Sequence, residues 1–334
     1  MVLPVTVAFW KPALALIRPL SQKLSWSRSP QTRICASTDS IHGMKASYDA
    51  LCDKLRTVSY LEGIMGLLGW DEQVMMSPGS EFARGKQKAA LAKTIHETKT
   101  DEEIGRLIRE IESSGEPMDE VMKANLREAK LRFERNRRMP SSLASRAAEL
   151  ETTAYGIWVK AREQDDFKMF APILNETIEL RKEICRITKP DMPLYDAAID
   201  SFDPRMSADR LADIFAAVKA DLTPLIRRIA DRVAQDPSLQ DIHPALRGGP
   251  EWDPAKQAAM CREIADALGF DPARGRMDVS VHPFTGGSHP SDVRITTRYS
   301  ADNWLEGLAG TVHECGHAMY EQGRPDAPGL ADLP

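Results

Sequence analysis

Apolar side chains recur at intervals of three and four residues along most of the chain, which is the spacing that gathers them on one face of an α-helix. The clearest run begins near Ala46, leads towards Trp70 and carries Leu51, Leu55, Val58, Leu61, Met65 and Leu68. Segments rich in Pro, Gly, Ser or Thr interrupt the pattern further on. More helices are expected at residues 81–98, 101–114, 117–138, 143–163, 167–188 and 254–268, and after the N-cap candidate Ser207. The sequence therefore predicts a mainly α-helical fold.

The pattern changes between residues 277 and 299. Met277–His282 and Val293–Tyr299 are short and rich in β-branched residues, and the segment between them, residues 285–290, is polar and contains two glycines. This pattern of residues predicts two strands that form a small hairpin, joined by a surface loop. No strand pattern alternates with the helices elsewhere, so a doubly wound sheet is not expected.

Composition narrows the range of functions. The chain has 334 residues, of which 42% are hydrophobic, and a formal net charge of −5, so it gives no general attraction to nucleic acid or to an anionic membrane. No apolar run approaches the ~20 residues of a membrane span. The five cysteines are scattered without a Cys-x-x-Cys spacing, which argues against a disulfide framework and against a cysteine zinc site.

The N-terminal stretch differs from the rest of the chain. Between Met1 and Thr38 it has five basic residues, several serines and no acidic residue. This composition is typical of an organellar transit peptide. We expect residues 1–43 to be a disordered targeting leader for the chloroplast or the mitochondrion, and residues 44–334 to be the functional domain. The alternative is that translation starts at Met44 and that the protein is cytoplasmic.

The candidate chemistry lies near the C-terminus, in the run His313-Glu314-Cys315-Gly316-His317. On a helix the two histidines are separated by about one turn, so that both imidazoles can bind one Zn²⁺ ion. Glu314 lies beside them, where it can take a proton from a water molecule on the metal without being a ligand. Cys315 points away from this face and is assigned to packing. The alternative, a pair of structural histidines, does not explain why the motif sits inside a helical pattern.

Zinc needs a third protein ligand, and its position separates the enzyme classes that share this motif. A metzincin would have Gly and His where this chain has Tyr320 and Gly323, so that class is excluded. In the remaining tail only Glu321, Asp326 and Asp332 could donate a carboxylate, and none is well placed. We expect the third ligand to lie beyond Pro334 and the catalytic domain to be incomplete at its C-terminus.

Several motifs together resemble the carboxypeptidase Taq family of zinc metallocarboxypeptidases. The run from His313 to Gly323 resembles the metal helix of that family. His282-Pro283-Phe284 and the Asp-x-Arg-x-Thr element that starts at Asp292 stand upstream in the family's order, and Gly69-Trp70-Asp71 resembles the end of its N-terminal helix. The resemblance extends from about Ala46 to Gly323.

The resemblance implies a large multi-helix metallopeptidase domain with a small sheet beside the active site. It also implies one Zn²⁺ per subunit, with other divalent metals as alternatives, and a homodimer. The reaction would be the removal of single C-terminal residues from peptides with a free C-terminal carboxylate, with Glu314 as the general base. The family's third ligand is a glutamate in a later His-Glu-Ser motif, which this sequence does not contain.

An enzyme of this type has to bind a terminal carboxylate, which calls for a cationic or hydrogen-bonding donor. Arg294, Arg298 and His282 are the candidates. On a strand, Asp292, Arg294, Thr296 and Arg298 share one face, so Asp292 and Thr296 are expected to support the site. For Asp292 and Arg294, an ion pair that only stiffens the strand is an equal alternative.

Two other functions remain open at this point. One is a zinc endopeptidase or aminopeptidase, for which a blocked substrate carboxylate would not stop cleavage. The other is a catalytically inactive helical protein that has lost the third metal ligand.

Overall fold

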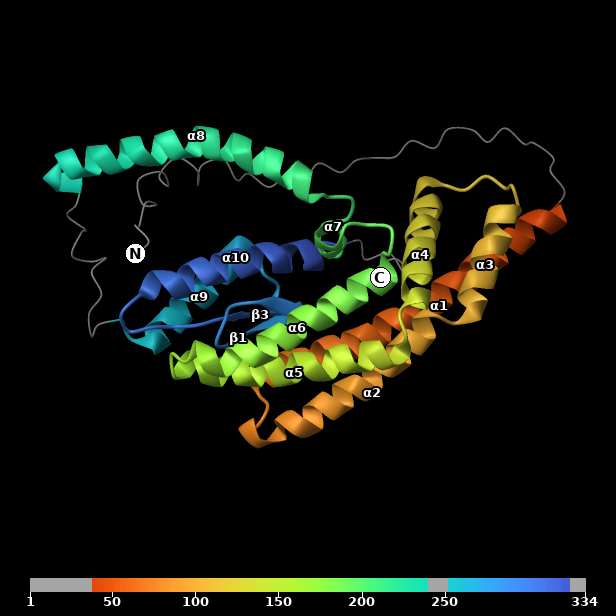
Figure 1. Ribbon diagram of the computed structural model, residues 1–334, viewed down its shortest axis with the longest axis horizontal. Helices are drawn as coiled ribbons and strands as arrows, with labels where there is room; N and C mark the ends of the chain where they lie inside the picture. The colour runs from red at the N-terminus through yellow and green to blue at the C-terminus, as the bar shows by residue number, and fades with distance from the viewer. Residues whose placement is uncertain (1–37, 240–251, 325–334) are drawn as a thin grey trace. The chain divides into compact units, whose positions relative to one another are not determined.

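The computed structural model describes residues 38–239 and 252–324 (Figure 1). The chain divides into two units, Met1–Thr38 and Asp39–Pro334, and the following concerns the second unit. The predicted leader, residues 1–43, lies outside the described residues except for 38–43, which belong to the first helix.

Helices make up most of the described residues, as the periodicity predicts. They are α1 (Thr38–Val74), α2 (Glu81–Lys99), α3 (Glu102–Ser113), α4 (Glu120–Arg138), α5 (Ser141–Glu163), α6 (Phe167–Thr188), α7 (Leu194–Ile199), α8 (Ala208–Gln235), α9 (Pro254–Leu268) and α10 (Trp304–Gln322). The mainly α-helical fold is confirmed. The sequence did not predict α7, because six residues are too few to show a helical period.

Side-chain caps fix several helix starts. Ser207 caps α8 as predicted, since its hydroxyl accepts a hydrogen bond from the backbone N–H of the third residue beyond it. Helix α4 starts three residues later than expected, because Asp119 is its cap. Helix α5 starts at Ser141, two residues before the expected start at residue 143, and follows Pro140.

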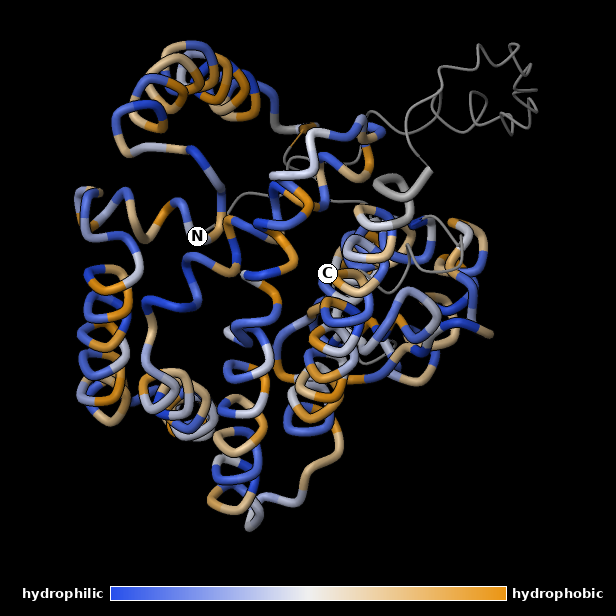
Figure 2. The backbone as a smooth tube through the Cα atoms, turned by 90° about the vertical axis from the view of Figure 1, so that its right-hand side faces the viewer, coloured by the Kyte–Doolittle hydropathy of each residue, from blue (hydrophilic) through white to orange (hydrophobic). Residues whose placement is uncertain are grey.

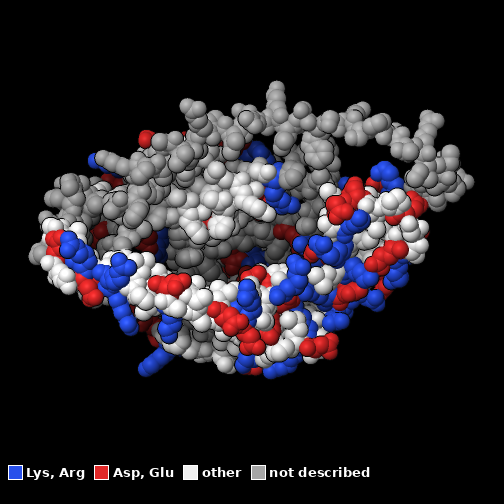
Figure 3. Space-filling view, turned by 90° about the horizontal axis from the view of Figure 1, so that it is seen from above, with Lys and Arg blue, Asp and Glu red and all other residues white. Residues whose placement is uncertain are grey.

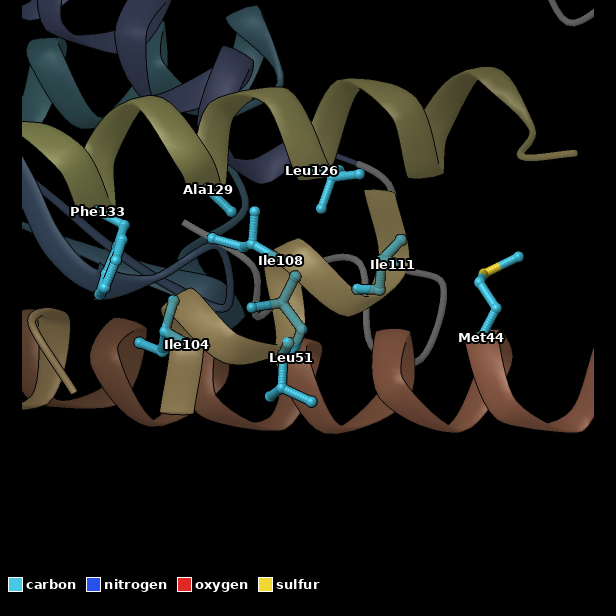
Figure 4. Close-up of a cluster of buried hydrophobic side chains, with 9 residues drawn as sticks. Met44, Leu51, Ile104, Ile108, Ile111, Leu126, Ala129 and Phe133 are labelled. Atoms are coloured by element: carbon cyan, nitrogen blue, oxygen red, sulfur yellow. The ribbon is translucent and has the colours of Figure 1, made fainter. Parts of the chain in front are cut away.

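One hydrophobic core joins α1, α3 and α4. Figure 4 shows Leu51 of α1 beneath Ile104 and Ile108 of α3, with Ala129 and Phe133 of α4 on the opposite side. Burial of each large side chain in such a cluster contributes roughly 1.5–3 kcal/mol. Hydrophobic and hydrophilic residues alternate around the turns of the helices in Figure 2, which is the pattern that one-sided burial requires.

The sheet differs from the predicted hairpin. It has three strands, β1 (Gly275–Val279), β2 (Thr285–His289) and β3 (Asp292–Thr297), in the order β1-β3-β2. Strands β1 and β3 are parallel, and β2 is antiparallel to β3. The hairpin of β1 and β3 was therefore wrong, and the segment predicted as a loop contains an edge strand. This strand was not recognised in the sequence because its glycines show no alternation of apolar and polar side chains. It is specified by backbone pairing to β3.

Helix α8 has no buried residue among those described. Its apolar positions repeat at helical intervals and are exposed, for example Phe215, Val218, Leu222 and Ile226. No helix in the described part of the chain is long and apolar enough to span a membrane. On the face seen in Figure 3, positive and negative side chains are interspersed.

Candidate metal centre

Helix α10 places the His-Glu-x-x-His motif at the border between the sheet and solvent. One face of the helix is buried and includes Glu314, Cys315 and Ala318, whereas His313 and His317 lie on its exposed side. Cys315 and Ala318 pack with Val293 of β3 in a hydrophobic cluster. Packing of α10 on the sheet therefore fixes the rotation of the helix and the direction of the histidines.

The two histidines have the geometry of a metal-binding pair. Their Nε2 atoms lie 3.2 Å apart, and the ring planes are inclined by 82°. Two nitrogens at 2.0–2.1 Å from a tetrahedral Zn²⁺ ion would be separated by about 3.3 Å. Both histidines therefore fit the role of ligands to one metal ion.

Glu314 is 6% exposed and is held by a residue of another element. The hydroxyl of Thr285, on β2, donates a hydrogen bond to Glu314 Oε2 at 2.6 Å. It also lies 3.1 Å from the backbone carbonyl oxygen of Glu314. The carboxylate is thus held by β2, and Glu314 lines the same cavity as both histidines.

Cys315, between the histidines in sequence, is fully buried. Burial raises the pKa of its thiol to about 11. Because the thiolate is the form that binds metals, this thiol is a poor ligand at neutral pH. Its packing role, predicted from its direction on the helix, agrees with its place in the hydrophobic cluster.

A cavity of about 740 Å³ opens in front of the motif. His313, Glu314 and His317 form one wall, and β2 with the preceding His282-Pro283-Phe284 segment forms another. Helix α1 supplies the third wall. The whole cavity is lined by Ser59, Glu62, Gly63, His282, Pro283, Phe284, Thr285, Gly286, Gly287, Ser288, His289, Pro290, Val293, His313, Glu314, His317, Tyr320, Glu321 and Arg324.

Of the three residues predicted to bind substrate, His282 lies in this cavity. The turn that carries it is fastened to β3 by Thr296, whose hydroxyl accepts a hydrogen bond from the backbone N–H of Phe284 at 2.9 Å. The Thr296 N–H in turn donates to the Phe284 carbonyl at 2.9 Å, and Ser280 bonds to the His282 carbonyl at 2.7 Å. Thr296 therefore supports the site through the backbone of this turn.

Arg294 does not lie in the cavity. Its guanidinium pairs with Asp292 at 2.9 Å and covers the ring of Trp70 at the end of α1, 4.5 Å from the centroid. Arg276 of β1 lies over the same ring at 4.8 Å. Asp292 also accepts a hydrogen bond from Ser288 at 2.7 Å. Burial would raise the pKa of Asp292, but these hydrogen bonds outweigh it and the pKa lies below its usual value.

Arg298 is also absent from the cavity lining. Its guanidinium pairs with Glu306 in the first turn of α10, and it donates to the carbonyl of Val281 at 3.2 Å. Arg298 was expected to share a face of the strand with Arg294 and Thr296, but it follows Thr297, the last residue of β3. Arg298 thus joins the end of β3 to the start of the metal helix.

Among the described residues, no third His, Cys, Asp or Glu completes a metal-binding group with the histidines. Glu321 lines the cavity and pairs with Arg324 at 3.2 Å. Asp326 and Asp332 lie outside the described residues. The expectation of a ligand beyond Pro334 stays a prediction.

Sequence reasoning missed two parts of the site. Thr285 fell in a segment predicted as a loop, so nothing linked it to Glu314. Helix α1 was not linked to the site either, although its pair of small residues, Gly63 and Gly66, stands out from the bulky helical pattern. A Cβ atom on Gly63 would lie 2.5 Å from the carbonyl oxygen of Ser288, and Gly66 similarly faces the carbonyl of Gly287. These glycines let α1 approach the backbone of β2.

The chain is similar to known metallocarboxypeptidases. The model of a family described as carboxypeptidase Taq (M32) metallopeptidase matches residues 50–333. Thermostable carboxypeptidase 1 of Thermus thermophilus is 35% identical over 292 residues, which cover 84% of this chain and 56% of the relative. Carboxypeptidase 1 of Bacillus subtilis is 28% identical over 275 residues, covering 82% of this chain and 54% of the relative. The solved structure of Trypanosoma cruzi metallocarboxypeptidase 1 has a TM-score of 0.72 and 33% identity, and the match covers 86% of this chain and 56% of that structure's chain. The chain thus spans little more than half the length of these relatives.

Proposed function

Because this chain belongs to the carboxypeptidase Taq family of metallopeptidases, we propose that the protein hydrolyses the C-terminal peptide bond of peptides in a metal-dependent reaction. The observation that supports this most directly is the 3.2 Å separation of the His313 and His317 Nε2 atoms, beside a buried Glu314 at the wall of a cavity. The family implies a divalent metal. We infer that the metal is zinc, since paired imidazole nitrogens at tetrahedral spacing suit this ion.

His313 and His317 would hold the metal through Nε2. A bound Zn²⁺ ion acts as a Lewis acid that polarises the scissile carbonyl and makes water more acidic. Glu314 takes a proton from the attacking water, and the water oxygen forms a bond to the carbonyl carbon. Glu314 then gives the proton to the leaving amine as the carbon–nitrogen bond breaks, which balances the hydrolysis.

His282 is the candidate for contact with the substrate's terminal carboxylate. It lines the cavity, and the hydrogen bonds of Thr296 fix the turn that carries it. Arg294 and Arg298 are not part of this proposal, since their guanidinium groups pair with Asp292 and Glu306 away from the cavity lining. Homodimer formation, implied by the resemblance, remains a proposal as well.

Two measurements, of peptide cleavage and of metal content, test the function. Purified protein supplied with Zn²⁺ is given a peptide with a free C-terminus and the same peptide with an amidated C-terminus. Release of single residues from the free peptide only is the expected result. Cleavage of both peptides would favour an endopeptidase or an aminopeptidase. The absence of both stoichiometric metal and turnover would favour an inactive helical protein.

The Glu314→Gln variant tests the assignment of the base. It should bind the metal with unchanged stoichiometry, because the histidines are intact, and lose at least about 100-fold in kcat, since general base catalysis is typically worth 10²–10⁴-fold. A variant that retains turnover would show that another group takes the proton.

A further inference from the structure

The hydrogen bond between Thr285 and Glu314 joins two elements that are far apart in sequence. Thr285 is on β2 and Glu314 on α10, and the donor and acceptor atoms are 2.6 Å apart. Among the residues that the structure describes, no other side chain donates to this carboxylate. No salt bridge is formed by Glu314 within the same residues.

A buried carboxylate is costly unless it has hydrogen-bond donors. Glu314 is buried, so its orientation depends on the donors around it. We propose that Thr285 is the positioning residue of the catalytic base: its hydroxyl holds Oε2 of Glu314 and leaves Oε1 for the proton of the attacking water. This inference rests on the proposed function of Glu314.

The position of Thr285 is itself fixed from two sides. In the sheet, Thr285 pairs with Ile295 of β3, and the residue before it is bonded to Thr296 through both its N–H and its carbonyl. Further along β2, the carbonyl of Ser288 lies against Gly63 of α1. Threonine is also a stiff side chain, since its branched Cβ restricts χ1. The hydroxyl is thus presented to the carboxylate by a rigid support.

Two substitutions separate the hydroxyl from the shape of the side chain. Thr285→Val keeps the branched shape and removes the donor, and Thr285→Ser keeps the donor. We expect kcat to fall roughly 10-fold to 100-fold in the valine variant, with KM changed less than about twofold, because a misplaced catalytic group costs turnover more than binding. The serine variant should return to within about threefold of the parent kcat. Metal stoichiometry should be the same in all three proteins.

Thr152 of α5 is a matched control. It is a buried threonine, and its hydroxyl likewise lies near a buried carboxylate, at 3.4 Å from Glu72, but it is not in the cavity lining. Thr152→Val should lower the stability and leave kcat unchanged. An equal loss of kcat in both valine variants, or a serine variant as slow as the valine one, would overturn the proposal.

A second measurement does not depend on activity. In metal-free protein, Thr285→Val, Glu314→Leu and the double variant form a cycle of unfolding equilibrium constants from urea titrations. If the hydrogen bond to the charged group exists, the two single substitutions each remove it, so their effects should not add. The unfolding equilibrium constant of the double variant should then be smaller, by a factor of about 10 or more, than the value expected from adding the two single effects. Coupling below about twofold would refute the inference. If the parent shows no hydrolysis, the proposed function fails, and the cycle still decides whether Thr285 holds Glu314.

Discussion

The guanidinium of Arg294 lies over the indole ring of Trp70, 4.5 Å from its centroid, and joins the central strand of the sheet to the end of α1. Trp70 is buried, and the ion pair of Arg294 with Asp292 sets the plane of the guanidinium. The arginine that the sequence suggested for substrate binding therefore has two partners within the protein.

Replacement of Arg294 by Ala should affect stability and not substrate binding. Its side chain is only 19% exposed, so loss of the stacking and of the ion pair should lower the free energy of unfolding by about 1–2 kcal/mol. Arg276 covers the same ring but is 46% exposed, and Arg276→Ala should cost less. Urea unfolding and KM for a free-C-terminus peptide check this. A large rise in KM for Arg294→Ala with unchanged stability would restore its role in binding.

Asp292 predicts a pH dependence of stability. Its folded-state pKa is depressed, so the carboxylate contributes stability that is fully present above the unfolded pKa of about 3.9 and is lost as the pH falls through the folded value. Asp292→Asn should therefore have a shallower fall in the free energy of unfolding below about pH 5 than the parent. Urea titrations at several acidic pH values measure this. Identical slopes in the two proteins would mean that the pKa of Asp292 is not depressed.

Removal of one metal ligand should abolish stable metal binding. His313→Ala leaves a single imidazole of the pair, and a direct ligand is expected to matter more than the outer contacts whose loss costs 10–100-fold in affinity. We expect metal affinity to fall by at least about 100-fold. Cys315→Ala is the control, since this buried thiol has a raised pKa and should leave affinity unchanged. Competition titration with a zinc chelator distinguishes them, and equal affinity of His313→Ala and the parent would exclude His313 as a ligand.

Gly63 predicts a steric limit in α1. In Gly63→Ala the new Cβ would meet the carbonyl oxygen of Ser288 at 2.5 Å, and neither backbone can yield easily. We expect a loss of about 1–3 kcal/mol and lower activity, because β2 carries Thr285. Gly69→Ala is the matched control in the same helix, with nothing within 4 Å, and should be neutral or stabilise by about 0.5–1 kcal/mol. Thermal unfolding that ranks the two variants the other way would contradict the close contact.

Two lysines of α2 form ion pairs whose contributions to the free energy of unfolding should differ with their burial. Lys88 pairs with Glu72 at 2.7 Å, and the two side chains are 7% and 4% exposed. Lys88→Met would leave Glu72 buried without its partner and should cost about 3–5 kcal/mol. Lys86 pairs with Glu149 at 2.6 Å on the surface, and Lys86→Met should cost less than about 1 kcal/mol. Urea unfolding of both variants tests the contrast, which equal losses would contradict.

The local parts of the candidate site follow from sequence spacing. Residues that are one helical turn apart share a face, so the approach of His313 to His317 needs only that the segment be helical. The helical periods and the Ser207 cap also depend on residues that are close in sequence, and they were predicted correctly. The family resemblance, also carried by local motifs, is confirmed.

Contacts between distant segments could not be predicted in this way. The pairing of β1 with β3 is parallel and requires β2 to lie on the other side of β3, an order that no local pattern contains. Arg294 and Thr296 share a face of β3, but only the approach of α1 decides that Arg294 meets Trp70 and not the cavity.

The sequence by itself determined most of the helices, the one-turn spacing of His313 and His317 and the motifs that indicate the family, because each of these features is local in the sequence. Only the tertiary structure decided which residues surround the pair. Thr285 reaches Glu314, 29 positions away in the sequence, because the sheet packs on α10 and two glycines of α1 admit the backbone of β2. Such contacts arise from packing of whole elements, whose relative positions are fixed by the sum of many weak interactions and not by any one motif.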